Sequence, residues 1–112
     1  MPLNIAFLDD EPALCELFKE TFESQDINIK TYVDPEVAIS DINLSMPGLV
    51  FIDYRLPKMT GDEVAKRINE SIPKVMITGD LNIVLGSDFI KIFKKPYSFE
   101  EMFHFIHSKL SD

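Results

Sequence analysis

The sequence predicts an α/β protein built on a parallel β-sheet. Five short apolar runs alternate with segments of helical periodicity along the chain, and short links join them. Three of these runs are almost continuously apolar, as in parallel strands that are covered on both faces. Since 112 residues is a common length for one domain, we expect residues 1–112 to form a single domain with right-handed crossovers.

The strands are predicted where apolar residues gather between turn signals. The first, third and fourth runs are the most apolar. The five predicted strands are Leu3–Leu8, Ile27–Val33, Leu49–Asp53, Lys74–Thr78 and Ile90–Phe93.

Helix starts are marked by proline and by capping sequences. Pro12 and Pro35 each follow an acidic residue and suit the first position of a helix. A capping-box pattern, S/T-x-x-E, begins at Thr60 and again at Ser98. Apolar residues then recur at spacings of three and four, which predicts the helix faces that pack on the sheet. These faces are Leu14, Leu17, Phe18 and Phe22 in the first helix, Val64, Ile68 and Ile72 in the third, and Phe99, Phe103, Ile106 and Leu110 in the last.

The fourth crossover is shorter than the others. Only eleven residues separate Thr78 from Ile90, and a crossover with its helix usually needs at least about 10–12. We therefore predict that the fourth helix is shortened or irregular.

Composition excludes several classes of function. The formal net charge of −8 opposes intrinsic nucleic-acid binding, which depends on Lys and Arg neutralising phosphates. A signal peptide and an apolar run long enough to cross a membrane are both missing from the sequence. The lone cysteine, Cys15, favours a reducing compartment and is predicted to be buried. We expect a cytoplasmic protein that contacts neither nucleic acid nor membrane.

Charged and hydroxyl side chains stand at the carboxyl ends of the predicted strands. Asp9 and Asp10 follow the first strand, Asp53 ends the third, Thr78 ends the fourth, and Lys95 follows the fifth. In open parallel sheets, sites form at this edge. Two carboxylates about 4 Å apart repel by roughly 4 kcal/mol at an effective dielectric of 20, unless a hard cation with oxygen ligands joins them. The pattern indicates a metal beside a reactive aspartate.

This residue set suits phosphoryl transfer. A carboxylate can attack phosphorus and form an aspartyl-phosphate. The negative charge on the phosphoryl oxygens must then be neutralised by a metal and by fixed donors. A lysine supplies a point charge, and a threonine hydroxyl supplies a hydrogen bond.

Over essentially its whole length, the chain resembles the receiver domains of bacterial two-component response regulators, in particular single-domain receivers of the chemotaxis-regulator type. Each matching segment is weak alone, but their order and spacing together are specific. The segments are Leu8–Glu11, Phe51–Gly61, Ile77–Gly79 and Lys94–Pro96.

The resemblance implies a doubly wound five-stranded sheet of order 2-1-3-4-5 with helices on both faces. It implies that Asp53 is the phosphoacceptor and that Thr78 and Lys95 contact the phosphoryl group. Asp10 would bind Mg²⁺ directly, Asp9 partly through water, and Arg55 through its main-chain carbonyl; Asp53 completes the metal site. It also implies a cis peptide bond between Lys95 and Pro96.

The implied function is signalling rather than turnover of a substrate. A sensor histidine kinase or a histidine phosphotransfer protein would donate the phosphoryl group to Asp53, and a conformational shift would signal to a downstream protein. The chain would catalyse only its own phosphorylation and dephosphorylation. A single-domain regulator, a relay intermediate, a phosphate sink and a receiver excised from a longer protein all suit the sequence.

Two rival functions follow from the same residues. One is a receiver-like interaction module that works without phosphorylation. The other is a phosphatase of the haloacid dehalogenase type, but Arg55 stands where that family needs a second aspartate. Ile92 also occupies a position that is aromatic in many receivers. We therefore expect signalling through the Asp53 edge, the first helix or the loop after the fourth strand.

Overall fold

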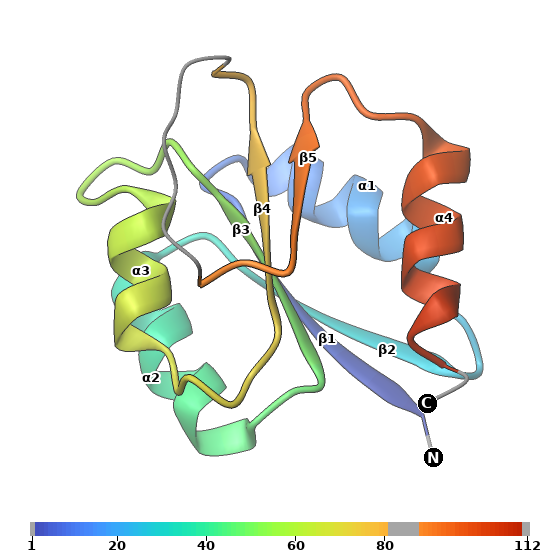
Figure 1. The fold of residues 1–112 in the computed structure, drawn as a ribbon, viewed down its shortest axis with the longest axis horizontal. Helices are drawn as coiled ribbons and strands as arrows, with labels where there is room; N and C mark the ends of the chain where they lie inside the picture. The colour runs from blue at the N-terminus through green and yellow to red at the C-terminus, as the bar shows by residue number, and fades with distance from the viewer. Residues whose placement is uncertain (1, 81–87, 111–112) are drawn as a thin grey trace.

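The computed structural model describes residues 2–80 and 88–110, which form a five-stranded parallel sheet with helices on both faces (Figure 1). The sheet order is β2-β1-β3-β4-β5, so the predicted order is confirmed. The strands are β1 (Leu3–Leu8), β2 (Ile27–Tyr32), β3 (Leu49–Asp53), β4 (Lys74–Thr78) and β5 (Lys91–Lys94). The helices are α1 (Pro12–Phe22), α2 (Pro35–Ser45), α3 (Gly61–Arg67) and α4 (Phe99–Ser108).

The helices begin where the capping signals predicted. The Asp34 carboxylate accepts a hydrogen bond from the Val37 amide at the start of α2. Thr60 and Glu63 form a reciprocal capping box at α3, and the Ser98 hydroxyl accepts from the Glu101 amide at α4. The predicted fourth helix falls mainly on residues 81–87, which lie outside the described residues.

Two apolar layers sandwich the sheet. One layer joins α1 and α4 to the sheet and contains Phe18, Phe51 and Ile106. The other lies under α2 and α3 and contains Ile42 and Val64. All five residues of β3 are buried, since both layers pack on this central strand. This burial places Asp53, at the end of β3, in the middle of one sheet edge.

The predicted packing faces are only partly correct. Leu17 on α1 is 59% exposed, and Phe99 and Phe103 on α4 are 53% and 37% exposed. Ile106 is buried as predicted, and Met102 rather than Phe99 or Phe103 is buried with it on α4. Helical spacing identifies which residues share one face of a helix. Whether that face points at the sheet depends on how closely α1 and α4 approach each other.

Helix α3 is also shorter than its apolar pattern suggested. It ends at Arg67, although both Ile68 and Ile72 are buried. The backbone is already extended at Ile68, so the two isoleucines reach the core from the segment that links α3 to β4 rather than from the helix.

Candidate functional site

Parallel pairing aligns the carboxyl ends of the strands. Leu8 lies opposite Ile52, Asp53 opposite Ile77, and Thr78 opposite Lys94. This register brings Asp9, Asp10 and Asp53 together, so that one carboxylate oxygen from each lies within 4.8 Å of the others. The predicted acidic cluster is therefore present.

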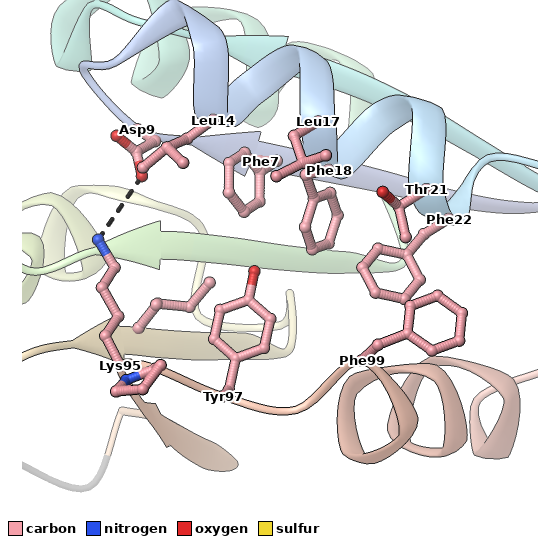
Figure 2. Close-up of a pocket in the computed structure, with 12 residues that line it drawn as sticks. Phe7, Asp9, Leu14, Leu17, Phe18, Thr21, Phe22, Lys95, Tyr97 and Phe99 are labelled. Carbon is pink, nitrogen blue, oxygen red and sulfur yellow. Dashed lines mark ion pairs between the residues drawn. The ribbon is translucent and has the colours of Figure 1, made fainter.

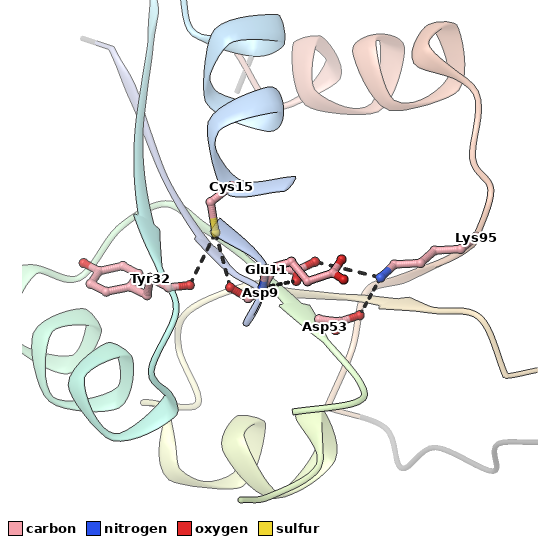
Figure 3. Close-up of polar contacts among 6 residues, drawn as sticks. All are labelled: Asp9, Glu11, Cys15, Tyr32, Asp53 and Lys95. Carbon is pink, nitrogen blue, oxygen red and sulfur yellow. Dashed lines mark hydrogen bonds and ion pairs between the residues drawn. The ribbon is translucent and has the colours of Figure 1, made fainter. Parts of the chain in front are cut away.

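Lys95 extends across this cluster from the end of β5. Its Nζ lies 3.0 Å from Asp53 Oδ1 and 3.8 Å from Asp9 Oδ2. Figure 2 shows the Asp9 contact and Figure 3 shows both. The Lys95–Pro96 peptide bond is cis, as the resemblance implied. The lysine adjacent to the proline is thus the one that contacts the aspartates.

The protein holds Asp9 from two sides. One carboxylate oxygen accepts a hydrogen bond from the Glu11 amide at 3.0 Å. The thiol of Cys15 donates to the Asp9 carbonyl at 3.3 Å and lies 3.6 Å from the Tyr32 carbonyl (Figure 3). The predicted burial of Cys15 is confirmed. Sequence reasoning did not identify this support, because it depends on how α1 sits over β1.

The electrostatics of the site disfavour negative charge. Burial raises the pKa of Asp9, and the nearby Asp53 charge raises it further, against the lowering effects of the Glu11 amide and Lys95. Burial likewise raises the pKa of Asp53, although the hydrogen bond from Lys95 opposes the shift. Burial alone would lower the pKa of Lys95, but the hydrogen bond and charge of Asp53 and the charge of Asp9 outweigh it and raise the pKa.

The donor set fits a hard divalent cation. Three carboxylates against one ammonium leave two uncompensated negative charges. Oxygen ligands of this type suit Mg²⁺ or Ca²⁺, and a bound cation would offset both the burial of these carboxylates and the repulsion between them. Asp10 is exposed and Asp9 and Asp53 are buried, so the cluster extends from the protein interior to its surface.

Thr78 and Arg55 make contacts beside the cluster. The Thr78 hydroxyl accepts a hydrogen bond from the Asp80 amide at 3.0 Å. The Arg55 guanidinium pairs with the Asp80 carboxylate at 2.8 Å. The segment after β4 is thereby tied to the loop after β3. This ion pair could not be predicted from residue spacing, since it depends on the conformation of two loops.

Gly61 allows α3 to begin against the end of β3. A Cβ atom at this position would lie 2.7 Å from the Asp53 carbonyl oxygen and 3.0 Å from the Tyr54 Cα. The Gly61 amide also donates to the Tyr54 carbonyl at 2.8 Å. The absence of a side chain at Gly61 therefore sets the position of the Asp53 backbone.

We expect Gly61→Ala to lower the free energy of unfolding by about 1–3 kcal/mol, because the methyl group must displace backbone atoms. Urea unfolding measures this difference. Gly79→Ala is the matched control, since no described heavy atom lies within 4 Å of a Cβ placed there. Equal destabilisation by the two changes would contradict the proposed steric role.

The raised pKa of Asp9 predicts a pH-dependent effect of Asp9→Asn. The wild-type carboxyl group contributes stability that is fully present below its ordinary pKa of 3.8 and is lost as the pH rises through the raised value. In metal-free buffer at neutral pH, the variant should therefore be at least as stable as the wild type, and it should lose that advantage below pH 3.8. Urea unfolding at several pH values tests this, and a less stable variant at neutral pH would contradict it.

The fold and this edge define a class: a doubly wound α/β domain with an acidic, lysine-bridged site at the carboxyl ends of its strands. Comparison with known proteins then identifies the family. The chain belongs to the response regulator receiver domain family, whose model matches residues 5–107.

Relatives and solved structures agree with this assignment. The chain is 30% identical over 114 residues to the response regulator protein TodT of Pseudomonas putida, covering 95% of this chain and 50% of TodT. It is 29% identical to the alkaline phosphatase synthesis transcriptional regulatory protein PhoP of Bacillus subtilis, covering 91% of this chain and 46% of PhoP. The chain thus spans about half the length of these relatives.

Two solved structures show the same fold. A receiver domain protein from Methanospirillum hungatei superposes with a TM-score of 0.88 at 21% identity, covering 99% of this chain and 95% of that one. The response regulator TrrA from Thermotoga maritima, solved in complex with Mg²⁺-BeF, gives a TM-score of 0.84 at 23% identity, covering 96% and 98%. Among the described residues of our chain, no helix is long and apolar enough to span a membrane.

Proposed function

We propose that residues 1–112 act as a phosphoacceptor domain in which Asp53 takes a phosphoryl group from a phosphohistidine of a partner protein. The donor would be a sensor histidine kinase or a histidine phosphotransfer protein. The contact between Lys95 Nζ and Asp53 Oδ1, at 3.0 Å inside the acidic cluster, carries this proposal. The positively charged Lys95 ammonium thus lies beside Asp53, the carboxylate at the centre of the sheet edge.

The transfer forms one bond and breaks one. An Asp53 oxygen attacks phosphorus, the phosphorus–nitrogen bond breaks, and the imidazole leaves with the bonding electron pair and takes up a proton. Attack requires an ionised Asp53, which the Lys95 ammonium favours. Lys95 can stay beside the acyl phosphate and pair with a phosphoryl oxygen as charge moves from the carboxylate to the product.

We propose Mg²⁺ as the metal, held by Asp9, Asp10 and Asp53, together with the main-chain carbonyl of Arg55. When bound, the ion would neutralise charge on the phosphoryl oxygens. Two observations support this proposal: the clustered carboxylate oxygens, and the Mg²⁺-BeF complex of TrrA, which has the same fold.

Thr78 is proposed to carry the conformational response. Its hydroxyl accepts from the Asp80 amide in this structure. To reach a phosphoryl group on Asp53, the hydroxyl would rotate, give up the hydrogen bond that it accepts from the Asp80 amide and donate one to a phosphoryl oxygen. Because Asp80 also pairs with Arg55, the exchange would act on two loops and present a changed surface to a downstream protein partner.

The buried, unpaired Cys15 fits a reducing compartment, and we propose a cytoplasmic location.

Phosphoramidate tests this proposal, because its phosphorus–nitrogen bond resembles that of phosphohistidine. We expect incubation with phosphoramidate and Mg²⁺ to add one phosphoryl group to the chain, as measured by intact mass. The same incubation with excess EDTA should add none. No gain with Mg²⁺, or an equal gain in EDTA, would contradict the proposed metal-assisted transfer.

A further inference from the structure

A pocket of about 590 Å³ opens between α1 and the link from β5 to α4. The sheet forms its floor, α1 forms one wall, and the link with the start of α4 forms the other (Figure 2). The residues that define these three sides are Phe7 and Ile77, Phe18 and Phe22, and Tyr97 and Phe99. The pocket is therefore a recess that reaches the sheet, rather than a flat apolar face.

Aromatic side chains surround the recess. Phe22 and Phe99 stack with ring centroids 5.3 Å apart at one end, and the Lys95–Asp9 ion pair lies at the other (Figure 2). Leu17 and Phe99 are 59% and 53% exposed at the rim. Sites for small molecules commonly have volumes of about 300–1,000 Å³ and are mostly apolar, with a few polar groups. This recess has both properties.

Besides Thr21, the recess is lined by Tyr97, which contributes a hydroxyl group. Figure 2 shows it pointing into the space beneath α1. Tyr97 makes an edge contact with Phe93, and its hydroxyl is not among the described buried polar atoms that lack a partner, so it remains open to water or a ligand. Burial raises its pKa, so the phenol stays protonated and can donate at neutral pH. A tyrosine hydroxyl usually finds a hydrogen-bond partner once it is buried, as a ligand in the recess would bury this one.

Charge near the recess favours a neutral ligand. Lys95 is already paired with Asp53 and Asp9, and Asp10 adds further negative charge nearby. An anion would meet carboxylates without a free ammonium to pair with. A polypeptide would cover the rim at Leu17 and Phe99, whereas a flat ring system that enters the recess can also contact the lining at Phe7 and Ile77.

We propose that this recess binds a neutral aromatic molecule of two or three fused rings that places a hydrogen-bond acceptor at the Tyr97 hydroxyl. The inference goes beyond phosphoryl transfer and does not depend on it. Such a ligand would lie directly beside Lys95 and Asp9, so its binding site adjoins the phosphorylation site.

Quinoline and naphthalene are suitable probes, because they share a shape and differ at one ring position that carries the acceptor nitrogen. We expect both to shift NMR signals of Phe7, Phe18 and Ile77 at pH 8 in a saturable way. Tyr97→Phe should weaken quinoline binding about fivefold, the worth of one hydrogen bond, and should leave naphthalene binding unchanged within twofold.

A blocking variant tests the location. Thr21 is exposed and lines the recess, so Thr21→Trp should abolish binding of both probes. Ser40→Trp, on the outer face of α2, is the matched control and should bind both as the wild type does. Saturable shifts confined to the rim at Leu17 and Phe99, which would indicate a protein-binding surface, would overturn the proposal. So would the absence of saturable shifts, or an equal effect of Tyr97→Phe on the two probes.

Discussion

Asp53→Asn should abolish phosphoryl uptake from phosphoramidate, with no mass gain at any time at which the wild type is modified. The amide has no carboxylate oxygen to attack phosphorus, yet its carbonyl oxygen can still accept the hydrogen bond that Lys95 donates. The variant also removes one of three clustered negative charges, so we expect it to stay folded. Intact mass and thermal unfolding, measured together, separate loss of chemistry from loss of structure.

The control for this variant is Asp26→Asn. Asp26 lies in the exposed turn between α1 and β2, far from the carboxyl edge of the sheet. It should take up phosphoryl groups at the wild-type rate. A phosphoryl group that persists on folded Asp53→Asn would place the acceptor at another residue.

Lys95→Met should slow phosphorylation by about a hundredfold without unfolding the domain. The loss of one preorganised donor at a site of developing negative charge typically costs a factor of this size or more. Methionine preserves much of the length of the side chain and removes the ammonium that lies 3.0 Å from Asp53. The rate is measured from the time course of intact mass at fixed Mg²⁺ and phosphoramidate.

Lys94→Met provides a closely matched control. Lys94 is the adjacent residue and is exposed on β5, and among the described residues it is Lys95, not Lys94, that pairs with Asp9 and Asp53. Its replacement should leave the rate within about twofold of the wild type, as surface substitutions usually do. If both lysine variants slowed the reaction equally, general positive charge rather than the Lys95 contact would be responsible.

The strand ends could be predicted because burial in a parallel sheet leaves a clear apolar pattern. Leu49–Asp53 and Lys74–Thr78 have the same bounds in the structure as in the prediction. Parallel strands also align their carboxyl ends, so the cluster of Asp9, Asp10 and Asp53 follows from topology. The order of strands and helices along the chain was thus enough to predict that these three carboxylates lie close together.

Other features of the site depend on conformations that residue patterns do not describe. Strand spacing did not distinguish Lys94 from Lys95; the family resemblance selected Lys95, and its Nζ lies 3.0 Å from Asp53 Oδ1 in the structure. The Arg55–Asp80 ion pair joins two loops of irregular backbone. The exposure of Leu17 and Phe99 reflects the gap between α1 and α4, which neither helix determines alone.

The buried thiol of Cys15 gives this protein an internal reporter of motion. Because the sulfur donates to the Asp9 carbonyl beneath α1, a thiol reagent can modify it only when that helix lifts from the sheet. The labelling rate under native conditions therefore measures the free energy of this local opening. Any ligand that stabilises the junction between β1 and α1 would therefore slow the reaction of the Cys15 thiol with the reagent.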